Sequence, residues 1–219
     1  MLYLVEKYPL NGVSHLCSIL PVLVGLFAYK QLSTGLRLLI LLFVVYFVND
    51  SYSLWLAIYR KSTFAVQNIQ PIWEVAFVVA IYLTYFQSLL SKQLVKYGVV
   101  ICITVIAFTF QTDSISPVGS VVHKLFIVTL LLMYLNEILQ EARVRNILVY
   151  SMFWVSAGLL IYLAGTFFFS LFSAYLYDDD TSNRVFDPFW NLNQMLYILF
   201  SLLASIGLWF SKYDSRNIV

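Results

Sequence analysis

The chain has 219 residues, of which 61% are hydrophobic and only 11% are charged, and its mean hydropathy is +0.84. An average soluble domain carries about 25% charged residues, so this composition excludes an ordinary water-soluble protein. The formal net charge is +2, and the sequence contains no run of basic residues. This excludes a typical nucleic-acid-binding protein.

Seven apolar stretches follow one another along the chain. Each is long enough for a helix to cross a hydrocarbon core of ~30 Å, which takes ~20 residues. Barrel strands are shorter and alternate in polarity, so these stretches predict helices. We therefore expect an all-α, seven-transmembrane-helix bundle that forms a single membrane domain over residues 1–219. The predicted spans are residues 13–32, 36–59, 71–91, 95–111, 119–139, 147–176 and 188–211.

Turn and capping residues mark several of these boundaries. Pro71 is expected to open the third span, because the first helical turn tolerates a residue without an N–H group. Asp187 is expected to cap the seventh span just before Pro188. The third and fourth spans are separated only by the short segment Lys92–Lys96. The first span contains Pro21 and no small-residue cleavage site, so we expect an anchor and not a signal peptide.

The basic residues of the loops predict the orientation in the membrane. With the N-terminus outside, eight Lys and Arg residues fall on the cytoplasmic side and four fall outside. The cytoplasmic set is Lys30, Arg37, Lys92, Lys96, Arg143, Arg145, Lys212 and Arg216, and the outer set is Lys7, Arg60, Lys61 and Arg184. We therefore expect the N-terminus outside and the C-terminus in the cytoplasm.

Polar side chains lie in the outer halves of five predicted spans, whereas the inner halves are mainly Leu, Ile, Val and Phe. Ionisable residues inside spans are costly and often functional. Asp50 is the deepest, ~13 Å from the outer end of its helix at 1.5 Å per residue. We predict an outward-facing pocket for a small or lipidic ligand, lined by His15, Asn49, Asp50, Glu74, His123, Lys124, Asn191, Asn193 and Gln194, with aromatic walls from Tyr46, Tyr52, Trp55, Trp73 and Trp190.

Within this pocket, Asp50 and Glu74 are expected to contact polar or cationic groups of the ligand, and the amides to supply hydrogen bonds. Each residue also has a structural explanation. His15, Glu74 and His123 lie near helix ends, where headgroups make polar residues ordinary, and Lys124 can extend to the surface. Asp50 lies too deep for that, but a hydrogen bond to another helix would also account for it.

Two further features concern contacts with partners. A charged cluster at the inner end of the fifth span consists of Glu137, Glu141, Arg143 and Arg145. It is either a solvated helix end, with Glu141 and Arg145 at ion-pair spacing, or a docking surface for a cytoplasmic partner. In the sixth span, Gly158 and Gly165 lie on one face and predict close helix packing, within the chain or in a homo-oligomer.

The chain carries no recognisable catalytic motif, and we expect no cofactor. A zinc site of His15 and His123 with Asp50 or Glu74 is chemically conceivable and would make the chain an intramembrane metal-dependent hydrolase. A conduit through one subunit would need polar residues at full membrane depth, which the inner halves lack. A homo-oligomeric pore or membrane-disrupting effector stays an alternative, because the pore would then lie between subunits.

The predicted layout resembles the seven-helix membrane sensory modules that precede kinase or other output domains in bacteria. The start of the last span, PFWNLN over Pro188–Asn193, is similar to bacterial proteins of that kind. The resemblance implies a non-enzymatic sensor or accessory protein in the bacterial inner membrane. Only residues 212–219 follow the last span, so we expect signalling through a separate membrane or cytoplasmic partner.

Overall fold

The computed structural model describes residues 9–140, 144–177 and 183–217. Within these ranges the chain is helical and contains no strand, which confirms the all-α prediction. The elements are α2 (Pro9–Cys17), α3 (Ile19–Ala28), η1 (Tyr29–Gln31), α4 (Thr34–Ile58), α5 (Phe64–Leu83), α6 (Leu89–Phe108), α7 (Pro117–Gln140), η2 (Ile147–Val149), α8 (Ser151–Gly165), α9 (Phe167–Leu171), α10 (Ser173–Leu176) and α11 (Asn183–Asn217).

Six helical segments are long and apolar enough to cross a membrane. They are Pro9–Gln31, Thr34–Ile58, Phe64–Leu83, Leu89–Phe108, Pro117–Gln140 and Arg184–Asp214. The remaining apolar helix, α8, has 15 residues and is shorter than these. After breaks at Thr166 and Phe172, the chain continues into the short helices α9 and α10, so the predicted span over residues 147–176 is divided.

The predicted boundaries of the third, fourth and seventh spans are wrong. Helix α5 begins at Phe64, so Pro71 lies inside it. The break before α6 falls at residues 84–88, and Lys92 and Lys96 lie in the first turns of α6. Helix α11 likewise begins before Pro188. Hydropathy misses these helix ends because they are polar where they face the loops or the pocket described below.

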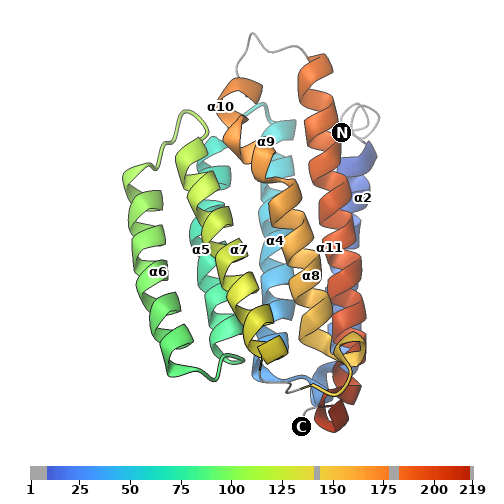
Figure 1. Cartoon of the computed structure of the whole chain (residues 1–219). Coiled ribbons are helices and arrows are strands. Elements are labelled where there is room, and N and C mark those ends of the chain that lie inside the picture. The colour runs from blue at the N-terminus through green and yellow to red at the C-terminus, as the bar shows by residue number, and fades with distance from the viewer. Residues whose placement is uncertain (1–8, 141–143, 178–182, 218–219) are drawn as a thin grey trace.

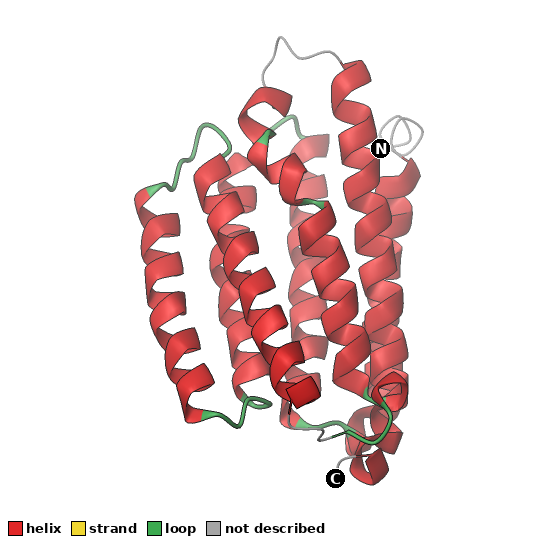
Figure 2. Cartoon of the chain, viewed as in Figure 1, coloured by secondary structure: helices red, strands yellow, loops and turns green. Residues whose placement is uncertain are grey.

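The helices run up and down through one bundle, with the loops gathered at its two ends (Figures 1 and 2). Helix α6 lies at one edge and packs on α5 and α7. On the other side α11 packs on α8, α3 and α2. The apolar core lies between these edges and includes Phe43, Leu130 and Phe200, which are almost fully buried.

Glycines permit the closest approach between α8 and α11. A Cβ atom built on Gly158 would lie 2.9 Å from the Cβ of Leu203, and one on Gly165 would lie 2.6 Å from a methyl carbon of Leu196. From the other helix, a Cβ on Gly207 would lie 2.7 Å from the carbonyl oxygen of Ser151. The predicted close packing of Gly158 and Gly165 is therefore present within the chain.

Residues at the end of α11 form hydrogen bonds with the connection between α7 and α8. Asp214 accepts hydrogen bonds from the backbone N–H of Ser151, at 3.0 Å, and from its hydroxyl. Asn217 donates to the carbonyl of Asn146 at 2.8 Å and accepts, through its own carbonyl, from the N–H of Arg145 at 3.1 Å. The Asp214 carboxylate therefore pairs with a backbone N–H group at the buried N-terminus of α8, where a negative charge is favourable.

Candidate ligand pocket

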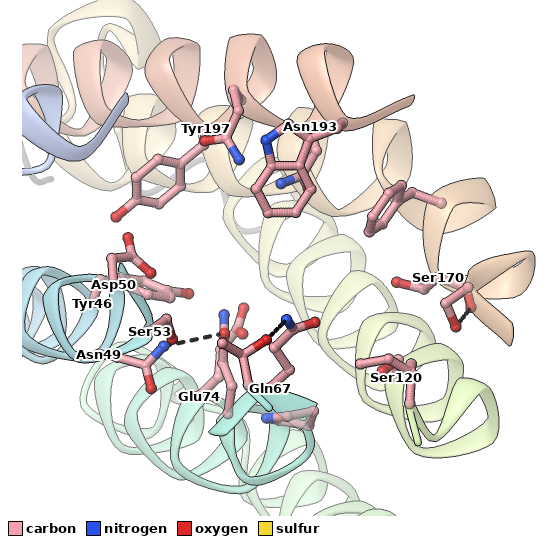
Figure 3. Close-up of a pocket in the computed structure, with 18 of the residues that line it drawn as sticks. Tyr46, Asn49, Asp50, Ser53, Gln67, Glu74, Ser120, Ser170, Asn193 and Tyr197 are labelled. Carbon is pink, nitrogen blue, oxygen red and sulfur yellow. Dashed lines mark hydrogen bonds between the residues drawn. The ribbon is translucent and has the colours of Figure 1, made fainter. Parts of the chain in front are cut away.

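A cavity of about 400 Å³ lies at the end of the bundle where α5, α7 and α11 begin and α4 ends. Side chains from α2, α4, α5, α7, α8, α9, α10 and α11 line it, and Figure 3 shows many of them. The polar lining comprises Asn11, Asn49, Asp50, Ser53, Thr63, Gln67, Gln70, Glu74, Ser120, His123, Lys124, Ser170, Ser173, Asn193 and Gln194, and the aromatic lining comprises Tyr46, Tyr162, Phe169, Tyr177, Phe186, Trp190 and Tyr197.

Seven of the nine residues predicted to line a pocket do so: Asn49, Asp50, Glu74, His123, Lys124, Asn193 and Gln194. His15 is not among the lining residues. Its ring stacks on Phe47 at 4.4 Å between centroids, and its Nε2 lies 3.3 Å from the hydroxyl of Ser51. Asn191 is half-buried on α11 and does not line the cavity either. The ligand-binding role of all nine stays a prediction.

Glu74, His123 and Lys124 form a buried cluster on one wall, with exposed fractions of 2%, 4% and 7%. His123 Nε2 lies 3.7 Å from Glu74 Oε2. Lys124 Nζ donates to the carbonyl oxygen of Thr166 at 3.0 Å and to its hydroxyl at 2.8 Å. The Lys124 side chain therefore points inward to the break between α8 and α9 and does not reach the surface. Its charge also attracts that of Glu74.

Several buried polar atoms around the cavity form no hydrogen bond of 3.5 Å or less within the described residues, although the Tyr46 hydroxyl interacts with Glu74 and His123 Nε2 lies 3.7 Å from Glu74 Oε2. They are the hydroxyl oxygens of Tyr46 and Tyr197, Oε1 of Glu74 and both ring nitrogens of His123. Buried polar groups in folded proteins are nearly always paired. All four side chains line the same cavity, so their unused hydrogen-bonding capacity points to a polar occupant.

Asp50 differs from Glu74 in its surroundings. Its side chain is only partly buried, and no cationic side chain of the described chain forms an ion pair with it. In Figure 3 its carboxylate and the phenol of Tyr197 point toward each other across the cavity. Neighbouring Asn49 donates to Gln70 Oε1 at 3.5 Å and also interacts with the Asp50 carboxyl group. Asp50 is thus a carboxylate that faces the cavity without a cation.

The aromatic walls were predicted in part. Tyr46 and Trp190 line the cavity, and Trp73 packs edge-on against Tyr46 with centroids 5.1 Å apart. Tyr52 and Trp55 stack on each other at 5.8 Å and remain 51% and 46% exposed, outside the cavity.

Other lining residues were missed for different reasons. Gln67 and Gln70 lie in the first turns of α5, before its predicted start, and would have been found with the correct helix boundary. Nothing in the sequence identifies Tyr162 and Tyr197 as lining residues, because a tyrosine in an apolar span is also typical of a core. At the mouth of the cavity, burial raises the pKa of the Tyr177 hydroxyl, so it stays protonated and can donate at neutral pH.

An apolar groove of about 280 Å³ adjoins the cavity between α9 and the first half of α11. It is lined by Gly165, Thr166, Phe168, Phe169, Phe172, Phe189, Leu192 and Asn193. Phe169 and Asn193 line both spaces, so the groove and the cavity are contiguous. Phe168, Phe172 and Leu192 are 59%, 49% and 47% exposed, which leaves the groove open on the outer surface of the bundle.

The predicted zinc ligands do not form a metal centre. Among the described residues, no group of three or more His, Cys, Asp or Glu side chains is placed to hold a metal ion. Of the four residues considered, Asp50, Glu74 and His123 line the cavity, and His15 packs outside it against Phe47.

The predicted partner surface at the far end of α7 is only partly described. Glu141 and Arg143 lie outside the described residues, and Arg145 is exposed. Glu137 is 7% exposed, and its carboxylate accepts hydrogen bonds from the backbone N–H groups of Gln87, at 2.8 Å, and Ser88, at 3.2 Å. The interpretation of Glu137 as a solvated or docking side chain is therefore wrong, because this carboxylate caps the start of α6.

The chain was also compared with known proteins. It matches no protein-family model, no curated protein and no solved structure. The resemblance to bacterial sensory modules therefore stays an expectation, and the geometry of the pocket is the basis for assigning a function.

Proposed function

We propose that this chain is a multi-pass membrane protein that binds the polar group of a small or lipidic ligand in the cavity. It acts as a sensor or accessory protein and passes the bound state to a separate partner. The observation that carries the proposal is the set of buried polar side chains around one open space, Tyr46, Glu74, His123 and Tyr197, which contain atoms that form no hydrogen bond of 3.5 Å or less within the described residues. Such atoms cost free energy in the empty protein and are compensated by a ligand that pairs with them.

In this proposal α8, α9 and α10 together form a seventh crossing. Helix α8 alone measures about 22 Å at 1.5 Å per residue, and the two short helices extend its path toward the pocket end. Seven crossings place the two ends of the chain on opposite sides of the membrane. We assign the pocket end to the outer side of a bacterial inner membrane, in keeping with the distribution of Lys and Arg between the loops.

Packing beneath the cavity favours binding over transport through a single subunit. Phe43 lies two turns of α4 below Asp50 and is fully buried, and its ring packs on Phe200 at 5.1 Å between centroids. Leu130 of α7 is buried at 1% exposure in the same core. The cavity therefore has an apolar floor at this level of the bundle, and the buried hydroxyl pairs Tyr82–Ser156 and Tyr134–Tyr150 lie nearer the opposite end.

The cavity can be tested by filling it. Ser53 lines the cavity on α4 and is half-buried, so Ser53→Trp places an indole ring in the space. Val48→Trp is the matched control, because Val48 lies on the same helix and is 59% exposed. Thermal unfolding in a non-ionic detergent is measured for both variants and the wild type, with and without a polar-lipid extract and a water-soluble extract of bacterial cells.

A ligand present at a hundred times its Kd stabilises a protein by ~2.7 kcal/mol. We therefore expect at least one extract to raise the Tm of the wild type and of Val48→Trp by several degrees, and Ser53→Trp to show no shift. The proposal is wrong if neither extract stabilises the wild type, or if Ser53→Trp is stabilised as much as the control.

A further inference from the structure

Acidic side chains outnumber basic ones in the lining of the cavity. Its lining contains two carboxylates, Asp50 and Glu74, and one ammonium group, that of Lys124. Lys124 attracts Glu74, and His123 lies within 3.7 Å of the same carboxylate. Asp50 has no such partner among the described residues. A cation or a proton stabilises a partly buried carboxyl group, because its charged form is less well solvated there than in water.

Aromatic rings form the wall next to Asp50. Tyr46, Tyr162 and Tyr197 all line the cavity, and their rings are contiguous. The ring centroids of Tyr46 and Tyr197 lie 5.8 Å apart, and those of Tyr162 and Tyr197 lie 5.7 Å apart. The face of an aromatic ring attracts an ammonium group, most strongly where water is excluded. A carboxylate beside several tyrosine rings is therefore suited to an organic cation.

The apolar groove beside the cavity is suited to an apolar part of the same ligand. It leads from Phe169 and Asn193, which also line the cavity, to the exposed side chains of Phe168, Phe172 and Leu192. No charged side chain lines it. The groove offers an alkyl chain a continuous apolar surface against which its CH₂ groups can pack.

We propose that the ligand is an alkylammonium amphiphile, whose positively charged nitrogen is neutralised by Asp50 and whose chain lies in the groove between α9 and α11. This inference rests on the proposed function of the cavity and names its ligand class. Glu74 and His123 then remain available for hydrogen bonds to other polar groups on the ligand.

Two probes with the same decyl group but different net charge test whether the cavity selects its ligand by charge. Decyltrimethylammonium carries a permanent positive charge, whereas decyldimethylamine N-oxide has no net charge at neutral pH. Binding is followed in dodecyl maltoside by the fluorescence of the native tryptophans, of which Trp190 lines the cavity. Asp50→Asn removes the proposed counter-ion. Asp113→Asn is the matched control, because Asp113 is exposed in the loop between α6 and α7 at the same end of the bundle.

We expect the wild type and Asp113→Asn to bind the ammonium probe at least about tenfold more tightly than the N-oxide. In Asp50→Asn this preference should disappear. Tetramethylammonium, which has no chain to fill the groove, should bind the wild type at least about tenfold more weakly than decyltrimethylammonium. The ligand class is wrong if the wild type binds the two decyl probes equally, or if Asp50→Asn keeps the preference.

A second pair of variants leaves the carboxylate in place. Tyr197→Phe removes the hydroxyl that the proposed function pairs with the ligand but keeps the ring, so the ratio between the affinities for the ammonium probe and for the N-oxide should not fall even where both probes bind more weakly. Tyr197→Leu removes the ring and should lower that preference about fivefold. An unchanged preference in Tyr197→Leu would contradict the aromatic part of the site.

The outcomes also separate this inference from the proposed function. If both decyl probes bind the wild type equally and Ser53→Trp abolishes both, the cavity binds ligands but does not select cations. If neither probe binds and no extract stabilises the wild type, both proposals fail.

Discussion

Glu137 shows how one buried carboxylate joins two helices. It lies in the last turn of α7, but its hydrogen bonds go to the backbone N–H groups of Gln87 and Ser88, where α6 begins. The hydroxyl of Ser88 accepts from the N–H of Ser91 at 3.4 Å and completes the cap. The first N–H groups of a helix have no partner inside it, so these contacts satisfy donors that would otherwise be buried or exposed to lipid.

Replacing this carboxylate should destabilise the bundle. We expect Glu137→Ala to lower the free energy of unfolding by about 1–3 kcal/mol, because it leaves two backbone donors without a charged acceptor. Glu137→Gln keeps one acceptor oxygen and should lose less. The measurement is denaturant unfolding in detergent micelles. Gln140→Ala is the control, since Gln140 is exposed and bonds only to Asn136 one turn away. Equal stability of Glu137→Ala and the control would contradict the capping role.

Single residues also show how far the site follows from the sequence. A charge inside an apolar span is visible, so Asp50, Glu74, His123 and Lys124 could all be identified as pocket residues. Their partners were not visible, because a partner comes from another helix at a depth and rotation that the sequence does not state. The alternative in which Lys124 extends to the surface is wrong, because its ammonium group donates to Thr166 inside the bundle.

At the level of elements, the contact between α8 and α11 depends on small residues. Gly207 faces the backbone of Ser151, which cannot move aside as a flexible side chain can. We expect Gly207→Ala to destabilise the protein by about 1–3 kcal/mol through overpacking, despite the better helix propensity of alanine. Thermal unfolding in micelles provides the measurement.

Gly12 supplies the matched control for that substitution. It also lies inside a helix, α2, but a Cβ atom built on it would meet nothing within 4 Å. Gly12→Ala should therefore be neutral or stabilising by up to about 1 kcal/mol, the propensity difference alone. A loss of stability in Gly12→Ala equal to that in Gly207→Ala would show that close packing is not the cause.

Helix ends were harder to predict than helices. Apolar runs located the middle of each span, because lipid requires them. The ends of α5 and α11 are polar for reasons of tertiary structure: Gln67 lines the cavity, and Asn68 donates to the carbonyls of Gln111 and Ser114 at 2.7 Å. A hydropathy pattern therefore predicts a loop where these polar helical turns lie. The break at Thr166 was also missed, since the surrounding sequence is uniformly apolar.

For the whole molecule, the composition predicted an all-helical bundle but not the order in which the helices pack. All seven apolar stretches have similar hydropathy, so nothing in them indicates that α6 lies at an edge or that α11 packs on α3. That order decides which polar residues meet. His15 and Asn191 were both predicted to line the pocket, but neither lines the cavity.

The proposed orientation can be tested with single cysteines at the two ends of the bundle. Asp113→Cys lies in the loop at the pocket end, and Gln87→Cys lies in the turn between α5 and α6 at the other end; both positions are exposed. In a background without Cys17 and Cys102, we expect a membrane-impermeant maleimide to label Asp113→Cys in spheroplasts of a bacterial host. Gln87→Cys should be labelled only after lysis. The reverse pattern would place the pocket on the cytoplasmic side.

Helix α11 is long enough to join the cavity to the opposite end of the bundle. It has 35 residues and measures about 50 Å at 1.5 Å per residue. Asn193 and Tyr197 line the cavity in the first half of this helix. Near its other end, Asp214 accepts a hydrogen bond from the backbone N–H of Ser151, where α8 begins. One continuous helix therefore carries both a wall of the cavity and the carboxylate that caps the start of α8, with no loop between them.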